Sequence, residues 1–160
     1  MGAVDVLKAA QHMERRGRDY YLLHAERAKG SHLSGPLTTL AGDEDKHVGT
    51  IGHLYESLRE GETWPAVPED VLPPTVIAQA VDYIVDAGGA GFTSGSALKE
   101  VYEHAYDFER RALEFYTRAA RESTDPKLVQ FLKFLANVEQ LHVAGIKRLL
   151  MRAEGNGETV

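Results

Sequence analysis

Apolar and small residues recur at alternating steps of three and four along four long stretches of the chain. This spacing places them on one face of an α-helix, so each stretch is predicted to be an amphipathic helix. Gly30 is expected to end the first helix, Pro36 fits the first turn of the second, and Asp125 caps the fourth. The predicted helices cover residues 3–29, 35–60, 96–122 and 126–153.

The links between these helices differ in length. The first and last pairs of helices are joined by short links, so each pair is predicted to form an antiparallel hairpin. Residues 62–95 form a long connection that includes an apolar stretch at 76–85, predicted to be a short extra helix. A connection of this length suits a crossover along a bundle. The sequence thus predicts an all-α four-helix bundle, one domain over residues 1–154, followed by a flexible tail at 155–160.

A repeat of charged residues lies within the apolar faces. Glu109 follows Glu14 by 95 positions, and each of these glutamates is followed 30 residues later by a Glu-x-x-His pair. Glu and His three positions apart share one face of a helix, so both can point into the bundle. The six candidate metal ligands are Glu14, Glu44, His47, Glu109, Glu139 and His142.

The position of these residues in apolar faces favours metal binding. Four converging carboxylates would be costly to bury and would repel one another. Two divalent cations would balance their charge, and each histidine would add a neutral ligand. The alternatives are exposed Glu-His pairs on helix surfaces, or buried ion pairs with Arg15 or Arg111. An oxygen-rich ligand set with two imidazoles suits two iron ions, although manganese or zinc can occupy the same ligands.

Four sequence motifs carry a resemblance to a known family. They are Ala10-x3-Glu14-x6-Tyr21, Leu40-Ala41-x2-Glu44-x2-His47, Ala105-x3-Glu109-x5-Phe115-Tyr116 and Leu135-Ala136-x2-Glu139-x2-His142. With these motifs the chain resembles the ferritin-like superfamily, and within it the rubrerythrin branch of diiron-carboxylate proteins.

The resemblance implies a role for each candidate residue. Glu44 and Glu139 would bridge the two metal ions. Glu14 and Glu109 would be terminal ligands, and His47 and His142 would each bind one ion. Tyr21 and Tyr116 would donate hydrogen bonds to ligand carboxylates.

Two departures from classical rubrerythrins change what is expected. The chain has no cysteine, whereas classical members carry a rubredoxin domain with four of them, so an external electron donor is expected. Ala112 stands where classical members have an extra glutamate, so a plainer and more symmetric site is expected. The small residues Gly17 and Ala112 are expected to leave space for an oxidant beside the metals.

The function expected from this reasoning is redox chemistry of a non-haem diiron centre toward O2 or H2O2, as a rubrerythrin-like oxidase or peroxidase. No catalytic residues are expected beyond the metal ligands. Iron binding, sequestration or storage is the alternative function, and a helical bundle without metal is a third. A homodimer is expected, with exchange of helices across the long connection left open.

Composition excludes several other classes of function. The net charge of −6 and the lack of a basic cluster argue against nucleic acid as a partner. No apolar run approaches the roughly 18 residues of a membrane span, and no apolar core of a signal peptide follows Met1. The absence of cysteine removes disulfides and iron–sulfur ligation and is typical of a cytoplasmic protein.

Overall fold

The computed structural model describes residues 2–30, 34–60 and 96–155, and these ranges contain four helices and no strand. The predicted all-α four-helix architecture is therefore confirmed. The predicted connection at 62–95, with its extra helix at 76–85, and the tail from residue 156 lie outside the described residues. The helices are α1 (Ala3–Arg27), α2 (Ser34–Arg59), α4 (Ser96–Glu122) and α5 (Pro126–Gly155).

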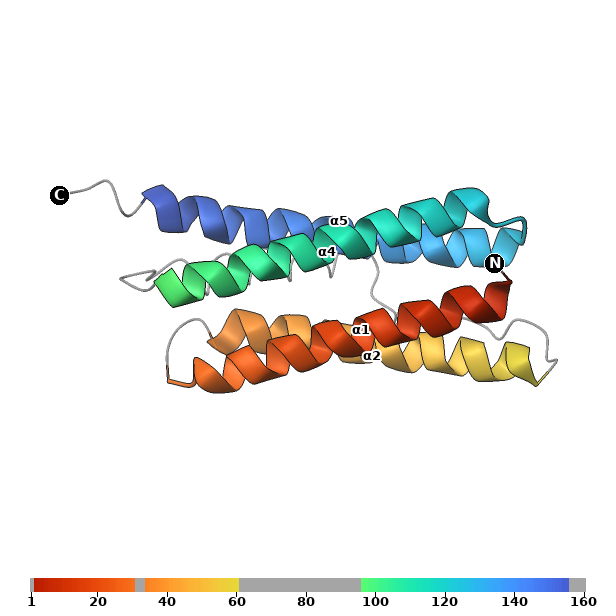
Figure 1. Cartoon of the computed structure of the whole chain (residues 1–160), viewed down its shortest axis with the longest axis horizontal. Helices are drawn as coiled ribbons and strands as arrows, with labels where there is room; N and C mark the ends of the chain where they lie inside the picture. Colours follow the sequence, from red (N-terminus) through yellow and green to blue (C-terminus); the bar gives the residue numbers. More distant parts are fainter. Residues whose placement is uncertain (1, 31–33, 61–95, 156–160) are drawn as a thin grey trace.

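The helices form two antiparallel hairpins. Helix α1 packs along α2, α4 packs along α5, and α1 also contacts α4 across the bundle. Figure 1 shows the two hairpins stacked on each other, with the axes of all four helices lying roughly along the long axis of the bundle. No helix in the described ranges is long and apolar enough to cross a membrane.

Local sequence explains where the hairpins turn. At the start of α5, the Oδ1 atom of Asp125 accepts hydrogen bonds from the backbone N–H groups of Lys127 (2.9 Å) and Leu128 (3.2 Å), as expected of an N-cap. After α1, Gly30 adopts φ 85°, a left-handed conformation that glycine reaches without steric cost. The Ser34 hydroxyl then donates a 3.0 Å hydrogen bond to the carbonyl of Ala25, which ties the start of α2 to the end of α1.

The core consists of two apolar clusters, one toward each end of the bundle. One cluster includes Leu7, Leu54 and Leu132, and the other includes Tyr21, Leu40 and Ile146. Along every helix, the site residues fall between a segment that belongs to one cluster and a segment that belongs to the other. The bundle therefore encloses a polar layer with apolar packing on both sides.

Candidate metal centre

All six predicted ligands meet in this buried polar layer. None of them exposes more than the 3% of His142, and the four carboxylates expose 1% or less. Their ligand atoms form two groups, and within each group the atoms lie within 4.8 Å of one another. One group is Glu14, Glu44, His47 and Glu139, and the other is Glu44, Glu109, Glu139 and His142. Glu44 and Glu139 belong to both groups, which is the geometry that a pair of bridging carboxylates requires.

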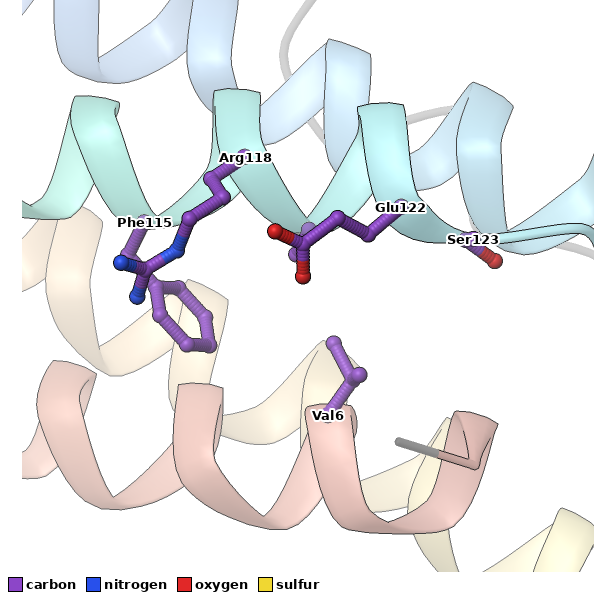
Figure 2. A pocket seen from close by; sticks show the side chains of 6 residues that line it. Val6, Phe115, Arg118, Glu122 and Ser123 are labelled. Carbon is purple, nitrogen blue, oxygen red and sulfur yellow. The ribbon is translucent and has the colours of Figure 1, made fainter.

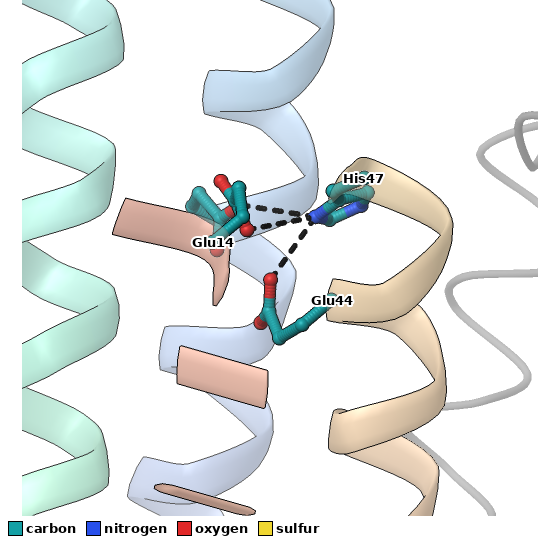
Figure 3. Close-up of side chains that lie close together, drawn as sticks. Glu14, Glu44 and His47 are labelled. Carbon is teal, nitrogen blue, oxygen red and sulfur yellow. Dashed lines mark hydrogen bonds and ion pairs between the residues drawn. The ribbon is translucent and has the colours of Figure 1, made fainter. Parts of the chain in front are cut away.

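Each histidine directs one ring nitrogen at the carboxylates of its group. The Nδ1 atom of His47 lies 3.2 Å from an Oε atom of Glu44 and 3.3 Å from one of Glu14, as Figure 3 shows. The Nδ1 atom of His142 lies 3.3 Å from Glu139 Oε2. The two imidazole rings are stacked, with centroids 6.0 Å apart. Each half of the site thus offers one nitrogen and three carboxylates to a cation.

Two tyrosines link the hairpins through hydrogen bonds to Glu14 and Glu109. We call these two the outer carboxylates, because each belongs to only one ligand group. The Tyr21 hydroxyl on α1 donates to Glu109 on α4, and the Tyr116 hydroxyl on α4 donates to Glu14 on α1. Burial, together with the nearby carboxylates, raises the pKa of both tyrosines well above the usual value, so both hydroxyls stay protonated. Each bond fixes one carboxylate oxygen and leaves the other facing the centre of the site.

Burial and crowding set the charge state of the cluster. Burial and repulsion from the neighbouring carboxylates raise the pKa of Glu44 and Glu139 well above the ordinary value. Burial also opposes ionisation of Glu14, but hydrogen bonds with Glu44 and His47 outweigh it and hold this pKa at about 2. The pKa of His142 is raised well above its usual value, because carboxylate partners outweigh the opposite effect of burial. Without cations, the cluster therefore holds protons in their place.

Several buried polar atoms of the cluster lack hydrogen-bond partners. A buried polar atom without a partner costs about 1–3 kcal/mol. Several such atoms in one layer therefore indicate a binding site for a ligand that would pair with them. Within the described part of the chain, the unpartnered atoms are Glu44 Oε1, Glu109 Oε2, both Oε atoms of Glu139 and both ring nitrogens of His142. Two divalent cations would pair with the carboxylate oxygens and with Nδ1 of His142, and would displace the protons. The ligand set fits a two-metal centre, and ligation by each residue stays a prediction.

Asp43 is a site residue that the sequence reasoning missed. This carboxylate is 7% exposed, and its Oδ2 atom lies 3.7 Å from Nε2 of His142. Its Oδ1 atom accepts a 3.1 Å hydrogen bond from Lys46. A carboxylate in this position favours a proton on Nε2 and leaves Nδ1 free for a metal. Its counterpart in the 95-residue repeat is Val138. The signal that could have found it is this break in the repeat, directly beside Glu44.

The expectation of open space beside Gly17 is wrong. A Cβ atom built on Gly17 would lie only 2.6 Å from Cε1 of Phe108, so the ring of Phe108 fills that space. Ala112, the repeat counterpart of Gly17, is 2% exposed. The pocket in Figure 2 lies elsewhere, near the start of α1 and the end of α4, and its lining contains none of the six ligands.

Comparison with known proteins agrees with the chemistry of this layer. The family model described as Rubrerythrin matches residues 5–150, which is most of the chain. Searches of curated proteins and of solved structures found no significant match. Four helices in two hairpins, with a carboxylate and histidine cluster between them, are the features that the resemblance implied. The chain belongs to the rubrerythrin family.

Proposed function

We propose that this protein binds two iron ions in the polar layer and uses them to reduce O2 or H2O2. The observation that carries the proposal is the sharing of Glu44 and Glu139 by both ligand groups. Shared carboxylates would hold the two cations next to each other, where both can act on one small molecule. A pair of ferrous ions would supply two electrons, which with two protons convert H2O2 to two molecules of water.

The residues of the chain would hold and insulate this pair. Glu14 and His47 would complete one half of the site, and Glu109 and His142 the other. Tyr21 would hold the carboxylate of Glu109 in one orientation. The apolar clusters on either side of the layer keep bulk water away, which strengthens every electrostatic interaction within it.

The proposal includes partners of two kinds. Electrons for repeated turnover would come from a separate donor, because the chain has no cysteine and hence no rubredoxin-type iron site. The native assembly would be a homodimer, with or without exchange of helices between the two chains.

Anaerobic loading with Fe(II), followed by H2O2, tests the proposed function. We expect near-ultraviolet ferric absorbance to rise in proportion to the bound iron. Glu44→Ala should abolish this rise, whereas Glu56→Ala should not, because Glu56 is a half-exposed glutamate of the same helix, paired with Arg59. Bound iron that stays ferrous after peroxide addition in the unmodified protein would overturn the proposal.

Iron storage is the competing function, because it would use the same ligands. Iron stoichiometry and assembly size separate the two. A dimer that saturates at about two irons per chain supports redox chemistry. A closed shell that takes up many irons per chain would instead establish storage.

A further inference from the structure

An open pocket lies between α1 and α4, on the outer side of the metal layer. Its volume is about 350 Å³, and its lining residues are Arg16, Tyr20, His104, Asp107, Phe108 and Arg111. Arg16 and Arg111 are counterparts in the 95-residue repeat, as are Glu14 and Glu109. The pseudo-twofold axis that relates the two glutamates therefore also passes between the two arginines. The pocket therefore lies on the side of the bundle where Arg16 and Arg111 each follow a candidate ligand glutamate by two residues.

Phe108 lies between this pocket and the part of the core that contains Glu44. Its ring lines the pocket on one side and contacts the α1 backbone at Gly17 on the other. The point where a Cβ of Gly17 would stand lies 2.6 Å from Cε1 of Phe108 and 3.6 Å from Cγ of Glu44. The Phe108 ring and the side chain of the bridging candidate Glu44 therefore border the same point beside Gly17. The ring thus lies between the pocket and the space beside Gly17 that the Glu44 side chain also borders.

The charge of the pocket mouth favours small anions. Neither Arg16 nor Arg111 has an ion-pair partner within residues 2–30, 34–60 and 96–151, while Asp107 lies near Arg110 (3.9 Å between Oδ1 and Nε). Two guanidinium groups in an acidic chain create a local positive potential that concentrates anions at this opening. Azide, a small linear anion that binds metals, is a suitable probe of the route.

We infer that Phe108 determines which molecules reach the metal centre, by admitting those small enough to pass its ring and excluding bulkier ones. The inference rests on the proposed function only for its peroxide measurement. Rotation of the Phe108 side chain would open a path for O2, azide or H2O2 without unfolding the helix. A hydroperoxide with an aromatic substituent needs the ring to leave its place. Phe108 is thus a specificity-determining residue rather than a metal ligand.

The first test uses Co(II)-loaded protein and needs no redox activity. We measure the rate at which azide changes the cobalt absorption bands, and the rate at which EDTA removes the cobalt. Phe108→Ala should accelerate azide binding by about tenfold or more, and Phe108→Trp should slow it. The matched control is Phe115→Ala, which removes another half-buried ring of α4 that lines the distant pocket of Figure 2. This control should leave both rates within about twofold of the unmodified protein.

The second test compares oxidants of different size on Fe(II)-loaded protein. The ratio of the oxidation rate with cumene hydroperoxide to that with H2O2 should rise about tenfold in Phe108→Ala, and stay unchanged in Phe115→Ala. Unchanged azide rates and an unchanged ratio in a folded Phe108→Ala variant would overturn the role of Phe108, even if H2O2 oxidises the unmodified protein. If no peroxide oxidises the unmodified protein, the proposed function fails, and the cobalt measurement alone decides the inference. Circular dichroism establishes that each variant is folded, and Phe108→Trp provides the opposite change if Phe108→Ala is not.

Discussion

The two halves of the metal layer have matching interiors but different surroundings. Inside, each half presents a glutamate, a Glu-x-x-His pair and a tyrosine from the opposite hairpin. Outside, His142 has the buried carboxylate of Asp43 behind it, whereas the repeat places Val138 at the equivalent position for His47. The ligands determine what can bind, and the residues behind them distinguish one cation position from the other.

The glycine and alanine beside the outer glutamates show a second difference. Gly17 leaves room that the ring of Phe108 fills, whereas Ala112 is itself a small buried side chain in an apolar cluster. Two positions that the repeat equates therefore have different neighbours. The internal repeat preserves the ligand geometry, and the residues around it are free to diverge.

The largest effect is expected from removing a shared carboxylate. Glu44→Ala or Glu139→Ala should each abolish binding of both metal ions, since both ligand groups need these residues. Glu14→Ala should spare the ion held by the other group. Mass spectrometry of metal content after loading measures this difference. Full occupancy in Glu44→Ala would contradict the bridging role, and Glu56→Ala again serves as the control.

The next effect concerns pH and compares the shared with the outer carboxylates. In metal-free protein, the raised pKa of Glu44 and Glu139 gives stability that is present below about pH 4.5 and is lost as pH rises through the folded-state pKa. The raised pKa of His142 likewise gives stability that is present below about pH 6.5 and is lost as pH rises through its folded-state pKa. Glu14, with its pKa lowered to about 2, instead gives stability above about pH 4.5 that is lost on acidification.

We therefore expect the melting temperature of metal-free protein to fall as pH rises from about 5.5 to 8.5. Metal-loaded protein should not follow this fall, because cations replace the protons and bind more tightly as pH rises. Thermal melts with and without metal measure the difference. Parallel pH profiles for the two forms would show that the cluster does not exchange protons for metal.

Removal of a tyrosine hydroxyl tests whether the interior of the site is symmetric. Tyr21→Phe and Tyr116→Phe should each lower the free energy of unfolding by about 1.5–3 kcal/mol, since each removes a buried hydrogen bond to a carboxylate. Urea denaturation measures both values, with Tyr106→Phe, a half-buried tyrosine of α4, as the control. Clearly unequal losses would show that the two halves already differ at the outer glutamates.

The smallest effect tests the asymmetry behind the histidines. Asp43→Asn should weaken one of the two metal-binding steps by about tenfold, within the range for residues that orient a metal-bound histidine. The other step should change little. Val138→Ala, at the repeat counterpart, should leave both steps near their original affinities. Calorimetric titration with Co(II) separates the steps, and an equal loss in both would refute a role confined to His142.

The sequence predicted the helices and the ligand cluster because both follow from periodic spacing. Apolar positions at three and four define helix faces, and the same spacing places Glu44 and His47 on one face. A carboxylate in an apolar face is conspicuous because burial is costly, so the repeat pointed directly to the residues that meet in the polar layer.

Asp43 and Phe108 could not be found in this way. Asp43 follows no apolar period, and its burial depends on how closely α2 approaches His142 on α5. The position of Phe108 depends on the rotamer of one ring across the interface of two helices, and the missing side chain of Gly17 predicts an empty space that this ring fills. Contacts between helices decide both cases, and the apolar spacing along one helix does not determine those contacts.

Tyr21 and Tyr116, each bonded to a glutamate of the other hairpin, also limit how the hairpins can slide along each other. Tyr21 reaches Glu109 from the side of one apolar cluster, and Tyr116 reaches Glu14 from the side of the other. Sliding the α4/α5 hairpin one way along the bundle would pull both hydroxyls away from their carboxylates. Sliding it the other way would push both rings against them. A shift of one helical residue is about 1.5 Å, so these two bonds fix the axial register of the hairpins before any cation arrives.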